Sequence, residues 1–335
     1  MPEVRKPRAL YVLSERAFES LYGPEERADV DELVEVYAPP LGRDEVRENL
    51  SVLEDAEVIL SGWSGPRLDE EFLAAAPNLR AFFYGAGTLK NTVTDAFWET
   101  DIIITSSWAA NAIPVAEYCL SQILFCLKHG WQHALCAERE STWRRLHEVP
   151  GAYGSNVGLI SLGMIGMKTL ELLRPFDVNV LVYSTSTTEE EAEEMGVELC
   201  SLDDIFRRSD VISLMTPLLP QTRGMITGRH FELMKDGAAF INTARGAVVR
   251  QEEMVEVLGR RPELLAVLDV THPEPPPEDS PLWDLPNVVL TPHIAGALGQ
   301  ERHRLGRYAV EELRRYLHGE PLKYRVTQEM FRRMA

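Results

Sequence analysis

Three stretches in the second half of the chain place a charged or titratable residue directly after an apolar, strand-like run. They are NTARGAVV (242–249), LDVTHPEP (268–275) and LPNVVLTPHIAG (285–296). The first contains Arg245, whose planar guanidinium offers two parallel donors to a carboxylate. The last contains His293, and histidine is the side chain that exchanges protons near neutral pH. The pattern is typical of a site that binds a small acid and moves a proton.

Each of these residues also has an ordinary structural explanation when taken alone. Arg245 suits a surface ion pair, and Glu274 of the second stretch lies in a proline-rich acidic loop, THPEPPPEDS. His293 suits a loop histidine with one backbone hydrogen bond, and His272 is an alternative proton donor in the loop of Glu274. The order of the three motifs along one fold pattern favours catalysis.

A glycine-rich turn, SLGMIG, follows the apolar run VGLISL (157–162) and opens a helical pattern, MIGMKTLELL (164–173). Backbone N–H groups at such a helix start bind a pyrophosphate. Ser161 replaces the first glycine of the dinucleotide fingerprint, which serine tolerates if the position does not need a positive φ. An ordinary turn between strand and helix is the alternative. The residues expected at the phosphates are Ser161, Leu162, Gly163, Met164, Ile165 and Gly166.

The elements that must position these residues are short strand-like runs alternating with amphipathic segments. In the first third they span 8–14, 34–39, 56–62, 79–85 and 101–107. In the second half they span 157–162, 178–184, 210–216, 238–243, 264–270 and 287–291. The pattern predicts βα units on parallel sheets, with a ligand crevice at the carboxyl ends of the strands. A long apolar helix is expected from Pro114 to about Lys128, with Pro114 in its first turn, and another from Ala297 to His318.

Length, composition and charge limit the cellular location and the binding partners that we expect for this protein. A chain of 335 residues is long enough for two domains. Its formal charge of −18 disfavours nucleic acid and anionic membranes, so an anionic substrate requires local cations. The N-terminal apolar run, Ala9 to Leu13, is too short for a signal or a span, and we expect a cytoplasmic protein. The spacing of the four cysteines suggests neither a metal site nor a disulfide framework.

On these motifs, and on DSPLWDLPNV (279–288) between the last two, the sequence resembles the D-isomer-specific 2-hydroxyacid dehydrogenases. The resemblance covers nearly the whole chain. It implies that Arg245 binds the carboxylate of a 2-oxo or 2-hydroxy acid and that His293 is the acid and base. Glu274 would orient and tune His293, and a nicotinamide cofactor would supply the hydride.

The resemblance also implies an α/β fold of two doubly wound parallel-sheet domains. A Rossmann-type cofactor domain, 112–299, would be inserted in a flavodoxin-like substrate domain made of 1–111 and a returning C-terminal helix in 300–335. It further implies a homodimer through the cofactor domain. The apolar helical stretch 117–131 suits such an interface, and it suits a core equally well.

Further site residues follow from the same resemblance. Asp269 would contact the nicotinamide carboxamide, although an aspartate at a strand end also suits a cap of local backbone. The adenosine would lie along Thr216 and Pro217, and the nicotinamide ribose along Thr243 and Ala244. The substrate carboxylate would bind backbone N–H groups of Gly85, Ala86 and Gly87.

The cofactor, NAD or NADP, is undecided. An NAD site normally ends its second strand with an acidic residue that accepts from the ribose hydroxyls, and here that strand ends at Ser184. Residues 184–188 contain neither a carboxylate to repel a 2′-phosphate nor an arginine to attract one. The acidic run 189–191 would disfavour NADP if it faced the site, and it suits the solvated first turn of a helix better.

The identity of the acid is open as well. Lys90 would meet a second anionic or polar group of a larger substrate, or simply face solvent. Trp63 and Trp108 would line an apolar pocket or belong to the core. Rival functions are a regulator of corepressor type that senses NAD(H) on the same fold, and a formate or phosphite dehydrogenase of the same superfamily. A glutamine in place of Glu274 is expected for formate.

Overall fold

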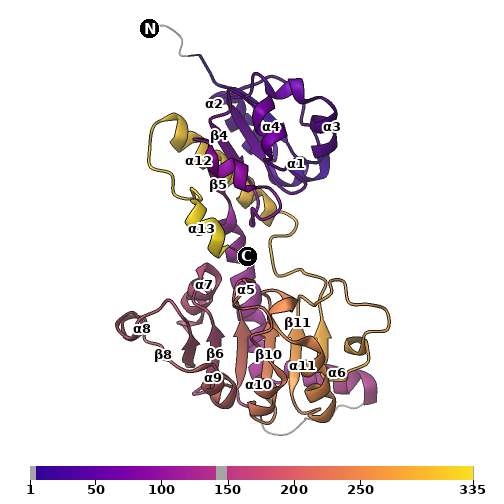
Figure 1. The fold of residues 1–335 in the computed structure, drawn as a ribbon. Coiled ribbons are helices and arrows are strands. Elements are labelled where there is room, and N and C mark those ends of the chain that lie inside the picture. The colour runs from indigo at the N-terminus through magenta and orange to yellow at the C-terminus, as the bar shows by residue number, and fades with distance from the viewer. Residues whose placement is uncertain (1–4, 141–148, 335) are drawn as a thin grey trace. The chain divides into compact units, whose positions relative to one another are not determined.

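The computed structural model describes residues 5–140 and 149–334, and the chain divides into two compact units. Unit 1 comprises residues 1–111 and 297–335, and unit 2 comprises residues 112–296. In Figure 1 unit 1 therefore combines indigo and purple elements with the yellow C-terminal helices. The chain returns to unit 1 between Gly296 and Ala297, whereas the sequence predicts this boundary after residue 299.

Unit 1 contains a five-stranded parallel sheet with the order β2-β1-β3-β4-β5. The strands are β1 (Arg8–Val12), β2 (Glu35–Val36), β3 (Val58–Ser61), β4 (Ala81–Tyr84) and β5 (Ile103–Ser106). The α-helices are α1 (Glu15–Leu21), α2 (Pro24–Leu33), α3 (Arg43–Glu48), α4 (Glu70–Ala75), α12 (Glu301–Leu317) and α13 (Gln328–Arg333), with 3-10 turns η1 (Leu50–Leu53) and η2 (Asp95–Glu99).

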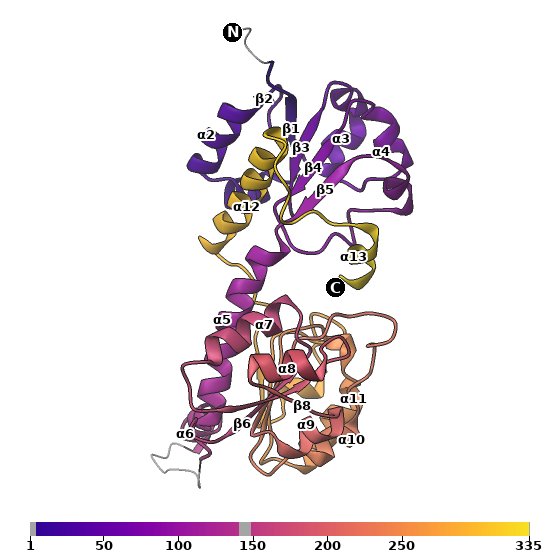
Figure 2. The ribbon, with the colours of Figure 1, turned by 90° about the vertical axis from the view of Figure 1, so that its left-hand side faces the viewer.

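Both faces of this sheet are buried, which explains the nearly continuous apolar runs of its strands. Successive β1 side chains point to opposite faces. Ala9 and Tyr11 pack in the core cluster that α1, α2 and α12 share, whereas Leu10 and Val12 pack in the cluster of α3 and α4. Figure 2 shows α2 and α12 on one side of the sheet and α3 and α4 on the other.

Unit 2 contains a seven-stranded parallel sheet with the order β12-β11-β10-β9-β6-β7-β8. The strands are β6 (Asn156–Ile160), β7 (Asn179–Tyr183), β8 (Glu198–Leu199), β9 (Val211–Leu214), β10 (Ala239–Asn242), β11 (Leu265–Leu268) and β12 (Val288–Leu290). Helix α5 (Trp108–Leu127) begins in unit 1 and continues in unit 2. The other helices of unit 2 are α6 (Gly130–Glu140), α7 (Met164–Leu173), α8 (Glu189–Met195), α9 (Leu202–Arg208), α10 (Gly228–Leu233) and α11 (Gln251–Arg260), with η3 (Gly246–Val248) and η4 (Pro281–Trp283). Helices α5 and α7 share one core cluster with the sheet, and α9, α10 and α11 share the other. The predicted pair of doubly wound parallel-sheet domains is confirmed.

Two details differ from the sequence prediction. The two-residue edge strand β8 gives too short a pattern to be recognised. Helix α5 begins at Trp108, so Pro114 lies inside the helix instead of in its first turn. Ala109 and Ala110 are buried, and the N–H of Ala110 donates to Ser107 O, so tertiary packing stabilises an earlier start than the proline predicts.

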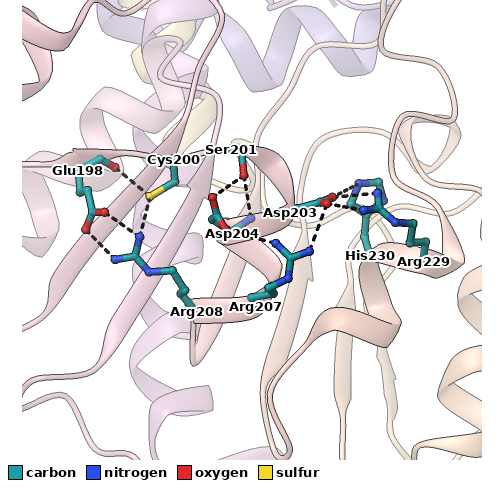
Figure 3. Close-up of polar contacts among 9 residues, drawn as sticks. All are labelled: Glu198, Cys200, Ser201, Asp203, Asp204, Arg207, Arg208, Arg229 and His230. Carbon is teal, nitrogen blue, oxygen red and sulfur yellow. Dashed lines mark hydrogen bonds and ion pairs between the residues drawn. The ribbon is translucent and has the colours of Figure 1, made fainter.

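Ion pairs hold the β8 edge of unit 2 together (Figure 3). Arg208 on α9 donates two hydrogen bonds of 2.7 Å to the carboxylate of Glu198 on β8. Asp203 on α9 pairs with Arg229 and lies 3.8 Å from His230 Nε2, both on α10. Burial raises the pKa of the nearby Cys200 thiol, and Glu198 adds to that shift. This cluster therefore joins elements of the fold and contains no activated nucleophile.

Candidate active site

The three candidate catalytic residues follow three neighbouring strands of the unit 2 sheet. Arg245 follows β10, Glu274 follows β11 and His293 follows β12. Because all three strands are parallel, their carboxyl ends lie at one edge of the sheet. One sheet edge thus positions residues that are far apart in the sequence.

Glu274 and His293 are in direct contact. The Oε1 atom of Glu274 lies 2.6 Å from Nδ1 of His293, and both side chains are partly exposed, 40% and 47%. A carboxylate at Nδ1 orients the imidazole and leaves Nε2 for a ligand. His272 lies in the same loop, and its backbone N–H donates to Gln251 Oε1. Glu274 is thus the carboxylate that contacts the imidazole of His293.

Arg245 is held beside this pair by the shape of the turn after β10. Asn242 Oδ1 accepts from Ala244 N at 3.0 Å, and Arg245 Nη1 donates to Ala244 O at 2.6 Å. Burial lowers the pKa of Arg245, and the negative charge of Glu274 opposes that shift. The guanidinium therefore stays a cation that can bind a carboxylate.

A glycine brings the turn of Arg245 against the loop of Glu274. A Cβ on Gly246 would lie 2.0 Å from Thr271 C and 2.1 Å from Thr271 O, so only glycine permits this approach. Sequence reasoning did not assign a role to Gly246 or to Asn242. The motif NTARG contains both residues, but only the tertiary contact shows what they do.

Asp269 holds the backbone that carries His293. Its Oδ1 accepts from Ile294 N at 2.8 Å and from Thr291 Oγ1 at 2.6 Å, and its Oδ2 accepts from Ala295 N at 2.9 Å. The N–H of His293 donates to Asp269 O at 3.0 Å. These bonds are the capping of local backbone that was one of the two predictions for Asp269. The contact of Asp269 with a nicotinamide carboxamide stays a prediction.

The glycine-rich turn lies where the order of the strands reverses. Strand β6 is flanked by β7 and β9, and the chain runs outward from it in opposite directions. Such a switch point is where a doubly wound sheet binds its ligand. Gly163 is the N-cap of α7, a helix of ten residues whose start coincides with the predicted one.

The two glycines of this turn differ in what surrounds them. A Cβ on Gly166 would lie 2.3 Å from Ser161 O, so the fold itself requires this glycine. A Cβ on Gly163 would meet only Ser161 Oγ, at 4.0 Å. Open space beside Gly163, at the amino end of α7, fits the close approach of a pyrophosphate.

The sequence predicts that Ser161 fits the turn if its position does not need a positive φ, and the structure contradicts that condition. The φ of Ser161 is +85°, in the left-handed region that favours glycine. Its N–H donates to Tyr183 O at 2.8 Å, which ties the turn to β7. The serine is thus strained in a backbone conformation that the close packing of the turn imposes.

The other expected cofactor residues follow β9, β10 and β7. Thr216 Oγ1 donates to Ile160 O at 3.3 Å, and Pro217 comes next in the chain. Thr243 Oγ1 lies 3.2 Å from Cys119 Sγ, so this buried hydroxyl points into the core, and Ala244 beside it is also buried.

After β7, Ser184 Oγ accepts from Ser186 N at 3.3 Å and from Thr187 Oγ1 at 2.8 Å. This hydroxyl therefore shapes the turn in which it stands. The run 189–191 forms the first turn of α8, as expected. These exposed glutamates follow Thr188, whose side chain caps the helix.

In unit 1 the predicted substrate turn follows β4. A Cβ on Gly85 would lie 2.9 Å from Tyr22 Oη, whereas a Cβ on Gly87 would meet only Asn111 Nδ2 at 4.0 Å. The hydroxyl of Ser106 is within hydrogen-bond distance of the carbonyls of Ala86, at 2.9 Å, and of Gly87.

Lys90 is exposed, as one of its two predictions states, and its ammonium also has a partner in the protein. Its ammonium donates to Phe331 O at 2.7 Å, a bond within unit 1, so it is not simply solvated. Trp63 and Trp108 are partly buried against the core of unit 1. Packing is therefore the role that the structure shows for both tryptophans.

Helix α5 is long and apolar enough to cross a membrane, and half of its apolar window is buried inside the protein. A helix in the core of a globular protein can have the same length and composition. Cys119, Cys126 and Cys200 form no disulfide. Among residues 5–140 and 149–334, no group of three or more His, Cys, Asp or Glu side chains is arranged to hold a metal ion.

Comparison with known proteins identifies relatives along most of the chain. Residues 121–295 match the family model described as D-isomer specific 2-hydroxyacid dehydrogenase, NAD binding domain. A D-3-phosphoglycerate dehydrogenase of Archaeoglobus fulgidus is 31% identical over 261 residues, which cover 78% of this chain and 49% of that protein. The chain thus spans about half the length of this relative.

Other relatives match over most of their own length. A hydroxypyruvate reductase of Thermotoga maritima is 29% identical over 285 residues, 84% of this chain and 90% of that protein. The solved structure of a D-mandelate dehydrogenase from Rhodotorula graminis superimposes with a TM-score of 0.80 at 23% identity, over 96% of this chain and 98% of that one. At this identity the structural likeness concerns the fold.

Proposed function

Because the chain belongs to the D-isomer specific 2-hydroxyacid dehydrogenase family, we propose that it is an oxidoreductase that interconverts a 2-oxo acid and a D-2-hydroxy acid with NAD or NADP. The observation that carries this proposal is the contact of Glu274 with His293 at the sheet edge where Arg245 also lies. An acid and base, an orienting carboxylate and a cation are the groups that this reaction needs.

Each residue has a defined task in this proposal. Arg245 binds the substrate carboxylate and polarises the carbonyl. His293 gives the proton to the oxygen that becomes the hydroxyl, and takes it back in the reverse direction. Glu274 holds the imidazole at Nδ1 so that Nε2 faces the substrate oxygen. Of the turn Gly85–Gly87, the backbone N–H groups of Ala86 and Gly87 bind the substrate carboxylate. The N–H of Gly85 instead donates to Ser61 O at 2.9 Å, which corrects the prediction for that residue.

Unit 2 is the cofactor domain of the proposal. The amino end of α7 and the open side of Gly163 hold the pyrophosphate, and Ser184 lies near the adenosine ribose. Thr216 and Pro217 line the adenosine, and Thr243 and Ala244 line the nicotinamide ribose. The bound dinucleotide supplies or accepts the hydride.

A homodimer through unit 2 and a cytoplasmic location complete the proposal. The stretch 117–131 contains the end of α5 and the start of α6, and Phe125 within it is 42% exposed. An exposed aromatic side chain on an apolar helix suits an interface between two copies.

The proposal is tested by the loss of reduced-nicotinamide absorbance with NADH and NADPH separately. The substrates are 2-oxo acids from glyoxylate and hydroxypyruvate to phenylpyruvate, and formate and phosphite are tested with the oxidised cofactors. We expect turnover of at least one 2-oxo acid that is lost in His293→Asn. Folded protein that binds the dinucleotide without turning over any of these compounds would contradict the proposal and favour a regulator.

A further inference from the structure

The C-terminal segment of the chain, residues 323–334, crosses unit 1 beside β5. Val326 N donates to Ile104 O at 2.9 Å, and Arg325 forms an antiparallel bridge with Thr105. The carboxylate of Glu312, which is 1% exposed on α12, accepts from Tyr324 N at 2.9 Å. The segment is therefore fixed to the sheet and to α12 before it forms α13.

A first connection runs from this segment to the turn after β4. Tyr324 O accepts from Ser106 N at 3.2 Å, and the Ser106 hydroxyl reaches the carbonyls of Ala86 and Gly87. In a trans peptide the N–H points away from the carbonyl that precedes it. Carbonyls that both face Ser106 therefore direct the N–H groups of Gly87 and Thr88 to the opposite side.

A second connection holds the far end of the same turn. The ammonium of Lys90 donates to Phe331 O on α13 at 2.7 Å and lies 4.5 Å from the centre of the Phe331 ring. That ring also packs against Trp98 of η2, with 5.4 Å between the ring centres. Leu89 is fully buried, so Lys90 extends from an anchored position.

We propose that Lys90 and the C-terminal segment position the turn Gly85–Lys90, so that affinity for the substrate acid depends on the contact of Lys90 with Phe331. The inference rests on the proposed function, in which this turn binds the substrate carboxylate. Gly87 gives the turn conformational freedom that would weaken such binding. Tethers at Ser106 and at Lys90 restrict that freedom before the substrate arrives. Lys90 is thus a positioning residue, and its ammonium is engaged by the protein instead of the substrate.

The test compares Lys90→Met with Lys6→Met in the full chain. Lys6 is a matched control, because its ammonium also donates to a backbone carbonyl of unit 1, Asp31 O, at 2.7 Å. Steady-state kinetics measure KM for the 2-oxo acid, KM for the reduced dinucleotide, and kcat. Hydrogen exchange measures protection of the amides of residues 86–90. Lys90→Arg tests rescue by a side chain that keeps the cation and its donors.

For Lys90→Met we expect the KM of the acid to rise about fivefold, with kcat and the dinucleotide KM changed less than about twofold. Amides 86–90 exchange faster in this variant only, and Lys90→Arg restores both readouts. An unchanged KM of the acid, or the same rise in Lys6→Met, overturns the proposal. If the wild type reduces no 2-oxo acid, the proposed function fails. Hydrogen exchange then tests alone whether Lys90 positions the turn, and unchanged protection of amides 86–90 in Lys90→Met overturns that proposal.

Discussion

Glu274 and His293 are separated by 19 positions in the sequence, and Oε1 of the first lies 2.6 Å from Nδ1 of the second. The contact exists because β11 and β12 are neighbouring parallel strands whose carboxyl ends open at the same edge. It converts two exposed loop side chains into one acid-base unit.

Glu274→Gln removes the charge of this unit and keeps the size of the side chain. We expect kcat for reduction of the 2-oxo acid to fall by about 10- to 100-fold, because the orienting and stabilising carboxylate is lost. The Kd of the reduced dinucleotide, measured by fluorescence titration, should not change. An unaltered kcat would show that the pair has no part in the chemical step.

Gly163→Ala and Gly166→Ala separate ligand binding from folding within one turn. Gly163 has a φ of −67°, which any residue adopts, and its side is open. Gly163→Ala should keep the Tm of the wild type and raise the Kd of the dinucleotide at least about tenfold. Gly166→Ala should lower the Tm, because its Cβ would collide with Ser161 O. If the wild type and Gly163→Ala bind the dinucleotide with equal affinity, this turn is not part of the cofactor site.

Ser161→Gly should stabilise unit 2. The left-handed φ of Ser161 costs a residue with a Cβ about 1 kcal/mol, which exceeds the added chain entropy that glycine brings to the unfolded state. We expect a Tm about 1–3 °C higher in calorimetry. Ser121→Gly, within α5, should lower the Tm instead. A lower Tm in Ser161→Gly would mean that the hydroxyl stabilises the turn more than the strain destabilises it.

Stability of unit 2 should decrease in acid. Burial lowers the pKa of His230 below its usual value of 6.5, and Asp203 opposes that shift. The unfolded chain then binds the proton more readily than the folded protein. The stabilisation by the neutral imidazole is therefore complete above pH 6.5 and is lost as the pH falls from that value through the lower pKa of the folded protein. The imidazole Nδ1 accepts from Thr227 N at 3.0 Å, a bond that protonation breaks.

His230→Gln keeps a hydrogen-bond acceptor at the start of α10 and removes the titratable imidazole. Between pH 7.5 and 5.5, its Tm should fall less than that of the wild type. His318→Gln, at an exposed histidine in unit 1, should follow the wild type. Identical pH profiles for all three proteins would exclude His230 as a source of the acid sensitivity.

Ser184→Asp should shift cofactor preference towards NADH. A carboxylate at this position accepts from ribose hydroxyls and repels a 2′-phosphate. We expect the ratio of kcat/KM for NADPH to that for NADH to fall at least about tenfold, while Thr185→Asp at the exposed neighbour has a smaller effect. A constant ratio in Ser184→Asp would place the adenosine ribose away from the end of β7.

Much of the fold is encoded locally and is predictable from the sequence. Strands buried on both faces of a parallel sheet form short, nearly continuous apolar runs, and these runs predict every strand of the two sheets except β8, which is too short to form one. The positions of Arg245, Glu274 and His293 after such strands follow from the same runs. So does the start of α7 at Met164, because a glycine-rich turn precedes its helical period.

Tertiary structure alone decided how those residues are used. The partner of Lys90 lies 241 positions away, and no local pattern reports a contact made by the return of the chain. Close packing gave Ser161 its left-handed backbone and turned the carboxylate of Asp269 to the loop of His293. Residue type and spacing determine which chemistry the chain can perform. Which groups face one another depends on contacts that form only when distant segments share one core.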